Sequence, residues 1–322
     1  MMKRNLRKRA VALGLMLAMT VSMMTGCGTD SGSEGKVSSG EVKSDDKGFY
    51  SYEGYVIKSE YPMDEKSLER AADRFQNVYQ LYLKDTKCKS YFAIVPDKNA
   101  YAAEAGRDVL DYEALKDKMK SGTSDFLEYI EISDLLMLPD YYKTDAHWRQ
   151  EKLYPVAQRL MKAMGGELMA DYDEVVASEA FTGAYGRQSD LEMEPEELIY
   201  LDNEVLEDCK VTDYETGKVI SVYDTEKAGS EEGDGYDLFL HGSKSLLTVE
   251  NPEAETDKEL VIFRDSFGSS IAPFFAEYYS KITLIDIRYL ASEMVGRFVD
   301  FDDQDILFLY STPVLNNSVT LK

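Results

Sequence analysis

The hydrophobic and polar positions along the chain follow two periods. From Asp64 to Lys84 the apolar residues recur every three or four positions, which predicts an amphipathic helix. Arg149 to Met164 repeats this pattern and stops at two glycines, and Tyr112 to Lys120 is a shorter stretch of the same kind. We therefore expect three helices within the first 164 residues.

Short apolar runs between and after these helices predict buried strands. SYFAIVP (90–96) is stopped by a proline, and FLEYIEIS (126–133) alternates apolar and polar residues. Later the alternation becomes regular, with expected strands at 259–263, 282–287 and 305–310 and expected helices at 269–279 and 291–298. Because strand–helix–strand units pair in parallel and place helices over the sheet, we predict an α/β sandwich with a mainly parallel central sheet and helices on both faces.

Residues 181 to about 249 have a different character. ELIYLD, VLEDCKVTDY and KVISVYD are short strand-like runs separated by Gly, Asp and Glu clusters. This spacing is typical of antiparallel strands. We expect a β-rich insertion within one α/β domain that spans residues 49–322.

The first residues indicate where the chain resides. A basic segment (residues 3–9) precedes AVALGLMLAMTVSMM, which is short for a membrane span and typical of a signal peptide. The run ends in MTGC, which resembles the lipobox of bacterial lipoproteins, where cleavage precedes the cysteine and lipid is attached to its thiol. We expect a signal peptide over 1–26, a lipidated Cys27 and a location on the extracytoplasmic face of the membrane. An uncleaved N-terminal anchor is the alternative.

Residues 27–48 are rich in Gly, Ser and charge, and we expect a flexible linker. Five of the 36 basic residues lie in the leader, whereas all 60 acidic residues follow it, so the remaining 31 basic residues leave a net charge of −29. Such a surface repels nucleic acid and anionic lipid headgroups, and we expect neither as a partner. A neutral or cationic substrate is compatible with this charge, and so is a simple role in solubility.

The remaining cysteines leave two possibilities open. Cys88 and Cys209 can form a disulfide outside the cytoplasm or remain free thiols. The chain has no CxxC motif and no histidine-rich cluster. We therefore expect neither a metal site nor a cofactor.

The stretch ELVIFRDSFGSS places Ser266 directly after a buried strand and before an expected helix. In parallel α/β sheets, ligands gather at the carboxyl ends of the strands. A serine on a tight strand-to-helix turn can expose a nucleophilic hydroxyl. It can equally well cap the helix that follows.

A serine nucleophile needs a base, and this chain has only two histidines. His147 lies in YYKTDAHW, two residues after Asp145. A carboxylate at that spacing can orient the imidazole and stabilise the imidazolium that forms when serine gives up its proton. Alternatively, Thr144 or Asp145 caps a helix that begins near Arg149, and His147 packs beneath Trp148.

TDAHW, LVIFRDSFGSSIAPFF and ITLIDIRYL together resemble the DHHW proteins of Gram-positive bacteria, relatives of the SGNH-like alginate O-acetyltransferases AlgX and AlgJ. YFAIVPDKNAY and YDLFLHGSKSLLTVENP extend the resemblance over about residues 91–310. It implies an SGNH-hydrolase-like fold with a catalytic triad of Ser266, His147 and Asp145. Ala146 stands where the DHHW motif has its first histidine. The AlgX-type motif has a small residue there, and the catalytic histidine is retained.

The donors of an oxyanion hole are less defined. The backbone N–H of Ser266 is a natural donor because it lies at a helix N-terminus. Gly242, in LHGS, is a second candidate, although an ordinary turn glycine explains it as well. His241 is either a substrate contact or a histidine at a strand end.

The resemblance implies serine-dependent acyl transfer, with O-acetylation of a cell-surface or secreted polysaccharide as the leading expectation. It further implies an acetyl donor delivered across the bilayer by a membrane-bound O-acyltransferase, near which a lipid tether would hold the enzyme. Two alternatives stay open. One is a carbohydrate acetylesterase with the same triad, and the other is a non-catalytic glycan-binding lipoprotein on an SGNH-like fold.

Overall fold

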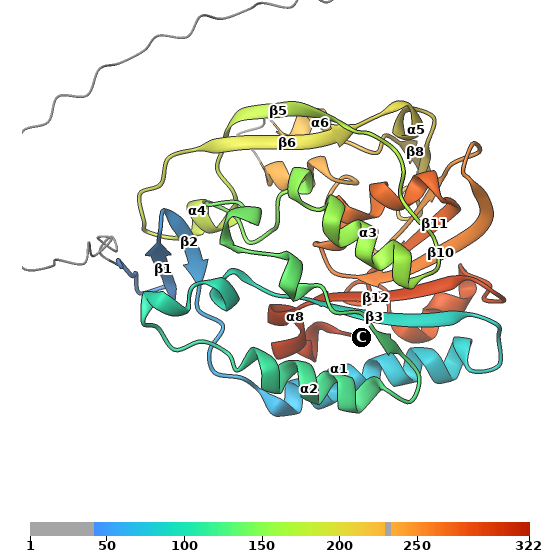
Figure 1. Ribbon diagram of the computed structural model, residues 1–322, viewed down its shortest axis with the longest axis horizontal. Helices are drawn as coiled ribbons and strands as arrows, with labels where there is room; N and C mark the ends of the chain where they lie inside the picture. The colour runs from blue at the N-terminus through green and yellow to red at the C-terminus, as the bar shows by residue number, and fades with distance from the viewer. Residues whose placement is uncertain (1–41, 229–232) are drawn as a thin grey trace, which may run out of the picture. The chain divides into compact units, whose positions relative to one another are not determined.

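The computed structural model describes residues 42–228 and 233–322 (Figure 1). At its centre is an eight-stranded sheet, whose strands in spatial order are β4 (Glu128–Tyr129), β3 (Lys89–Val95), β12 (Asp305–Ser311), β10 (Thr256–Arg264), β11 (Tyr279–Ile285), β9 (Leu246–Glu250), β7 (Lys210–Asp213) and β8 (Lys218–Ile220). The first five run parallel to one another. The last three continue the sheet in antiparallel pairings. The predicted mainly parallel α/β fold is confirmed.

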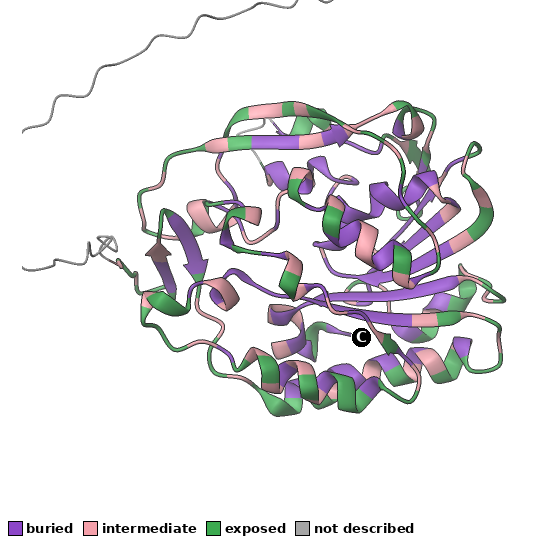
Figure 2. Cartoon of the chain, viewed as in Figure 1, coloured by how far each residue is buried: buried purple, intermediate pink, exposed green. Residues whose placement is uncertain are grey.

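The central strands bury both of their faces. On β3, Tyr91, Ala93 and Val95 belong to one hydrophobic core, whereas Phe92 and Ile94 belong to the other. Figure 2 shows the central strands buried along most of their length, and exposed residues on the outer faces of the helices, on the loops and on the β5–β6 hairpin. Strands buried on both faces read as continuous apolar runs, which is why β3, β10 and β12 stand out in the sequence.

Helices cover each face of the sheet. The first core is closed by α3 (Tyr154–Ala163) and α7 (Gly268–Ile271), and the second by α1 (Glu65–Val78), α2 (Tyr112–Thr123) and α8 (Thr312–Asn316). In Figure 1, α1 and α2 lie below β3 and β12, and α3 lies above them. Asp64 caps α1 by accepting hydrogen bonds from the backbone N–H groups of Lys66 and Ser67. A π-helical turn over Tyr79–Leu83 extends the helix to the predicted end.

Two expected helices are shorter than their patterns suggest. The stretch from Arg149 begins with a 3₁₀ turn (Gln150–Lys152), and α3 starts only at Tyr154, with a proline in its first turn. The stretch after Ser266 is divided between α7 and a 3₁₀ segment (Ala272–Glu277) that has a proline near its start. In both cases proline fits the first turn but lacks the N–H that would continue a preceding helix.

The β-rich insertion is joined to the central sheet. β9 pairs with β11, with Val249 opposite Ile282, and β7 and β8 extend the sheet outward from it. A separate hairpin is formed by β5 (Asp173–Phe181) and β6 (Glu196–Asp202), with α4 (Ala184–Gln188) between them. The short helices α5 (Glu204–Glu207) and α6 (Thr225–Ala228) complete this region. VLEDCKVTDY was expected to be a strand, but its first half forms α5 because Asn203 caps the helix there.

The N-terminal part of the described chain forms a hairpin of β1 (Phe49–Tyr52) and β2 (Tyr55–Lys58). Residues 42–48, which we expected in the linker, contact the domain: Ser44 bridges to Tyr50, and the Lys47 ammonium lies 2.7 Å from the Asp190 carboxylate. The packed chain thus begins slightly earlier than expected. The rest of the linker, the signal peptide and Cys27 lie outside the described residues. Across residues 42–228 and 233–322, no helix combines the length and apolar character needed to cross a bilayer.

Candidate active site

Ser266 lies on the turn that follows β10, at the carboxyl edge of the parallel strands. The turn is held by the buried Asp265, whose carboxylate accepts hydrogen bonds from the backbone N–H of Phe267 at 3.0 Å and of Ser311 at 2.7 Å. Gly268 lets the turn close tightly, because a Cβ there would lie 2.7 Å from the Cβ of Arg264. Ser266 therefore lies on a tight turn that is hydrogen-bonded to the end of β12.

His147 is presented by a hairpin-like loop. Tyr141 bridges to Trp148 across the loop, and the Tyr142 N–H donates to the carbonyl of His147 at 3.0 Å. The buried Trp148 indole N–H donates to the Ser270 hydroxyl at 2.9 Å and to the Phe267 carbonyl at 3.2 Å. This indole fastens the histidine loop to the serine turn, although the two segments are more than a hundred residues apart in the sequence.

The three residues of the expected triad lie in one hydrogen-bonded line. His147 Nε2 is 2.7 Å from Ser266 Oγ, and His147 Nδ1 is 2.5 Å from Asp145 Oδ1. The Ser266–His147 distance is within the range of a nucleophile–base hydrogen bond, and the His147–Asp145 distance is that of a short, charge-assisted one. The sequence motif and the fold thus bring Ser266, His147 and Asp145 together in the order that the resemblance implied.

Asp145 is fully buried, and both of its carboxylate oxygens accept hydrogen bonds. Oδ1 also accepts from the His147 backbone N–H at 3.1 Å, and Oδ2 accepts from the Ala184 N–H at 2.6 Å. Burial alone would raise the pKa of Asp145, but the neighbouring His147 and these hydrogen bonds hold it well below its ordinary value. The carboxylate therefore stays ionised beside the imidazole.

The neighbouring residues do not cap a helix as the alternative interpretation proposed. Thr144 Oγ1 donates to Glu196 Oε1 at 2.9 Å and accepts from the Gly183 N–H at 2.9 Å. Glu196 also pairs with Arg149 at 3.0 Å. These contacts join the histidine loop to β6 and to the turn before α4.

A cavity of about 180 Å³ opens beside Ser266 and His147. Its polar walls come from the loop after β3 and from β2, and its apolar walls include the segment after β12. The lining residues are Ile57, Lys58, Asp97, Lys98, Asn99, Ala146, His147, Tyr185, Ser266, Phe267, Ser311, Pro313 and Val314. Ala146 is one of them, so the departure from the DHHW pattern changes the wall of this cavity and leaves the triad intact.

Lys98 is an unusual member of this wall because it is almost entirely buried. Its ammonium donates to the backbone carbonyls of Val56, Tyr142 and Lys143, the latter two at 3.1 and 3.4 Å. It thereby joins β2 to the backbone of the histidine loop. Burial lowers the pKa of Lys98 to about 7, against the opposing charges of Asp145, Glu196 and Asp97. The sequence analysis missed this residue, although its position just after the buried strand β3 was a usable signal.

Of the two expected oxyanion donors, Ser266 lines the cavity beside the triad and Gly242 does not. Among the described residues, no hydrogen bond uses the Ser266 backbone N–H, which leaves it free to meet a substrate oxygen. The Gly242 N–H instead donates to the Phe239 carbonyl, and a Cβ at Gly242 would collide with the Asp237 carboxylate. Its positive φ of 78° and its close approach to Asp237 both explain why a glycine stands at position 242.

His241 is occupied within its own loop. Its Nδ1 lies 3.0 Å from the Asp224 carboxylate, and its Nε2 lies 3.1 Å from the Ser221 carbonyl. Neither His241 nor Gly242 lines the cavity beside Ser266. The structure thus does not bring these two candidates to the triad.

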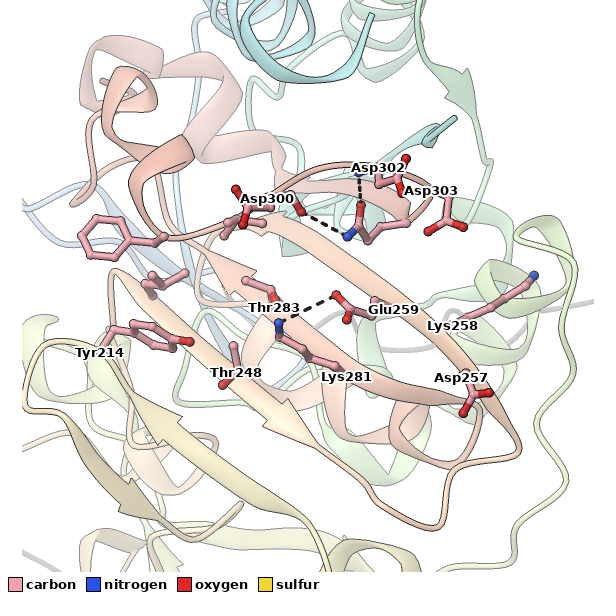
Figure 3. Close-up of a pocket in the computed structure, with 14 residues that line it drawn as sticks. Tyr214, Thr248, Asp257, Lys258, Glu259, Lys281, Thr283, Asp300, Asp302 and Asp303 are labelled. Atoms are coloured by element: carbon pink, nitrogen blue, oxygen red, sulfur yellow. Dashed lines mark hydrogen bonds and ion pairs between the residues drawn. The ribbon is translucent and has the colours of Figure 1, made fainter. Parts of the chain in front are cut away.

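A larger hollow, about 650 Å³ in volume, lies at the opposite edge of the sheet (Figure 3). It is formed by the amino-terminal parts of β10 and β11, by β9, and by the segment before β12. Lys281 and Glu259 pair across it at 3.8 Å, and Tyr214 meets Phe298 edge to face at 6.4 Å. No member of the triad lines it, so it is separate from the candidate active site.

The described residues contain neither a metal-binding cluster nor a disulfide. No cluster of three or more His, Cys, Asp or Glu side chains in residues 42–228 and 233–322 is arranged to hold a metal ion. Cys88 and Cys209 are free thiols, so the disulfide alternative does not occur in this structure. Cys209 donates instead to the Val205 carbonyl at 3.2 Å.

No protein-family model matches the chain, and no curated protein matches it either. Among solved structures, a DHHW family protein from Eubacterium siraeum is similar, with a TM-score of 0.63 and 18% identity over 86% of this chain and 94% of that one. Bacillus cereus PatB1, solved with a sulfonyl adduct, has a TM-score of 0.64 and 19% identity over 85% of this chain and 96% of that one. At such identities the likeness is one of fold. The expected resemblance to DHHW proteins is thereby confirmed at the level of the fold.

Proposed function

We propose that this protein transfers short acyl groups through an ester on Ser266. The observation that carries the proposal is the hydrogen-bonded line from Ser266 Oγ through His147 to the buried Asp145 carboxylate. It lies at the carboxyl edge of a parallel sheet and beside a small cavity. This arrangement fits nucleophilic acyl transfer better than simple packing, because an unreactive core serine has no need of an oriented imidazole.

In the first half of the reaction, Ser266 Oγ attacks the carbonyl carbon of the acyl donor while His147 Nε2 takes its proton. The Asp145 carboxylate stabilises the imidazolium that results. The Ser266 N–H is placed to donate to the developing oxyanion. When the tetrahedral intermediate collapses, the imidazolium gives its proton to the leaving group, and the acyl group remains on Ser266.

In the second half, an acceptor hydroxyl attacks the acyl carbon of the serine ester. His147 Nε2 takes the acceptor proton and returns it to Ser266 Oγ as the ester bond breaks. Sugar hydroxyl and water would react by the same steps. The distinction between transferase and esterase therefore depends on which acceptor reaches the acyl-enzyme.

We further propose that the acyl group is acetyl and the acceptor a cell-surface or secreted polysaccharide. The motif resemblance to O-acetyltransferases supports this assignment, and so does a cavity of about 180 Å³ with Ile57, Pro313 and Val314 among its walls, which suits a short acyl chain. A lipid on Cys27 would hold the enzyme at the extracytoplasmic membrane face, close to a membrane-bound O-acyltransferase that supplies acetyl groups.

The test compares the purified wild-type protein with Ser266→Ala, His147→Ala and Ser269→Ala, using p-nitrophenyl acetate as donor. Ser269 is the matched control, because it is a buried serine of the next turn with no hydrogen-bond partner for its hydroxyl in the described structure. We expect Ser266→Ala and His147→Ala to lower the enzymatic rate of nitrophenol release by about 10⁶-fold. Ser269→Ala should retain the wild-type rate.

Mass spectrometry of the intact protein should find one acetyl group, located on Ser266. A sulfonyl fluoride is a useful second probe, given that PatB1 shares the fold and was solved with a sulfonyl adduct. Acetate recovered on an added oligosaccharide would identify a transferase, and acetate released only to water would identify an esterase. Wild-type release equal to that of Ser266→Ala would refute acyl transfer. Glycan affinity without turnover would then favour the binding-protein alternative.

A further inference from the structure

The imidazole of His147 is stacked on an aromatic ring from the insertion. The Tyr236 ring lies parallel to it, with the centroids 3.7 Å apart and an angle of 4° between the planes. Phe267 contacts the imidazole from another side, at 4.8 Å and 55°. Neutral aromatic pairs prefer offset or edge-to-face arrangements, so this face-to-face overlap is the unfavoured geometry for two uncharged rings. It is the favoured one when one ring carries a positive charge.

Tyr236 is held firmly in this position. Its hydroxyl donates to Ser270 Oγ at 2.7 Å, and the same oxygen accepts from the Trp148 indole at 2.9 Å. Tyr236 is almost fully buried, and burial raises its pKa well above its ordinary value, so the phenol stays neutral. One serine hydroxyl therefore fixes both the ring against His147 and the indole that anchors the histidine loop.

The charged groups around His147 favour a positively charged imidazole. Asp145 lies against Nδ1, and Asp237, which follows Tyr236, lies close enough to interact with the imidazole electrostatically. Burial raises the pKa of Asp237, together with the neighbouring charge of Asp234. Lys58 and Lys98 both line the same cavity, and the Lys98 ammonium donates to three backbone carbonyls. The face of Tyr236 adds attraction for the charged ring without adding another titratable carboxylate.

We propose that Tyr236 is a positioning residue that orients His147 and stabilises the imidazolium formed during acyl transfer. The proposal rests on the proposed function, because it assigns Tyr236 a role in the same reaction. When Ser266 Oγ gives its proton to His147 Nε2, the ring becomes cationic over the electron-rich face of Tyr236. The attraction appears only in that charged state, so it lowers the barrier rather than merely binding the resting enzyme.

The test is a pH profile of acyl transfer for wild type, Tyr236→Phe and Tyr236→Leu. The phenylalanine variant keeps the ring and loses only the hydrogen bond to Ser270, so its acidic inflection should stay at the wild-type pH. The leucine variant loses the ring. We expect its plateau rate to fall by about 5- to 30-fold and its acidic inflection to move to lower pH by about half a unit to one unit, since protonation of the imidazole is no longer favoured by the ring.

A second measurement does not depend on turnover. Because the chain has only two histidines, NMR can follow the protonation of the His147 ring directly, with the variant His241→Asn identifying its signal. Loss of the ring should shift that titration to lower pH by the same amount as the acidic inflection. Tyr236→Met, which fills more of the space, serves if the leucine variant does not fold.

An unchanged inflection and an unchanged NMR titration in the leucine and methionine variants would overturn the proposal and leave Tyr236 as packing. If the wild-type protein shows no Ser266-dependent acyl transfer, the proposed function has failed. In that case the NMR titration still decides whether the ring favours the charged imidazole. The two failures are therefore distinguishable.

Discussion

Gly183 offers a test of how the triad carboxylate is held. A Cβ built at this position would lie 2.5 Å from Asp145 Oδ2 and 2.8 Å from Asp145 Cα. Its backbone angles, φ −73° and ψ −179°, are accessible to alanine, so Gly183→Ala perturbs the site through its methyl group and not through backbone strain. The variant adds one methyl group against a fully buried side chain.

The expected magnitude follows from that overlap. Ordinary carbon contacts are about 3.5 Å, so the methyl and the Asp145 carboxylate must separate by about 1 Å. A shift of that size lengthens the bonds from Asp145 to His147 Nδ1 and to the Ala184 N–H, which now span 2.5 and 2.6 Å. We expect the acyl-transfer rate to fall about 100-fold, as for a 1 Å misplacement of a catalytic group, with a loss of about 1–3 kcal/mol in unfolding free energy from overpacking.

The assay is nitrophenyl acetate turnover together with thermal unfolding. Gly122→Ala is the control, because its Cβ would lie 2.9 Å from the Ala72 Cβ, in the contact between α2 and α1. It introduces a comparable overlap away from the triad and should change the melting temperature without changing the rate. A folded Gly183→Ala protein that keeps the wild-type rate, while Asp145→Asn is inactive, would refute the steric reasoning.

Three further predictions concern titration and thiols. The pKa of Asp145 is lowered in the folded state, so its stabilising contribution is complete above the unfolded value of about 3.9 and is lost as the pH falls through the lower folded value. The unfolding free energies of wild type and Asp145→Asn should therefore converge below about pH 4, and a gap that widens on acidification would contradict this. The pKa of Lys98 is about 7 in the folded protein, whereas in the unfolded chain its side chain stays protonated up to about pH 10. Between these two pH values the unfolded chain therefore binds more protons than the folded protein. Wild type should gain stability relative to Lys98→Met across that range in urea titrations, and a constant difference would contradict the lowered pKa of Lys98. Because Cys88 and Cys209 are free and burial raises the pKa of Cys209 to about 12, reductant should leave the melting temperature unchanged and native Cys209 should resist thiol reagents. A Cys88–Cys209 peptide in a non-reducing digest would be the opposite result.

The elements that could be predicted were those whose sequence pattern agrees with their packing. β3, β10 and β12 are buried on both faces, and their uninterrupted apolar runs place them within a few residues of their true ends. FLEYIEIS shrinks to the two-residue β4, because only Glu128 and Tyr129 find partners on β3 at the edge of the sheet. The helix expected after Ser266 is divided because Pro273 cannot donate the hydrogen bond that would continue α7.

The candidate site likewise contains residues that the sequence could predict and residues that it could not. Ser266, His147 and Asp145 could be proposed because short-range motifs carry them, and the parallel strand order then explains why they meet. Tyr236 could not be found from its sequence, since its place on the imidazole depends on how the insertion folds back over the triad. Gly242 and His241 looked like site residues in the sequence, but their loop uses the glycine N–H and the imidazole for its own hydrogen bonds.

The position of β12 in the sheet affects how the active site forms during folding. Of the described strands it comes last in the sequence, yet it pairs with β3 on one side and β10 on the other, and the Ser311 N–H at its end donates to Asp265, the neighbour of Ser266. During synthesis the earlier strands emerge without the strand that must separate them. Chains that stop before residue 305 lack β12 and the hydrogen bond from the Ser311 N–H to Asp265, so we expect them to show no Ser266-dependent acyl transfer.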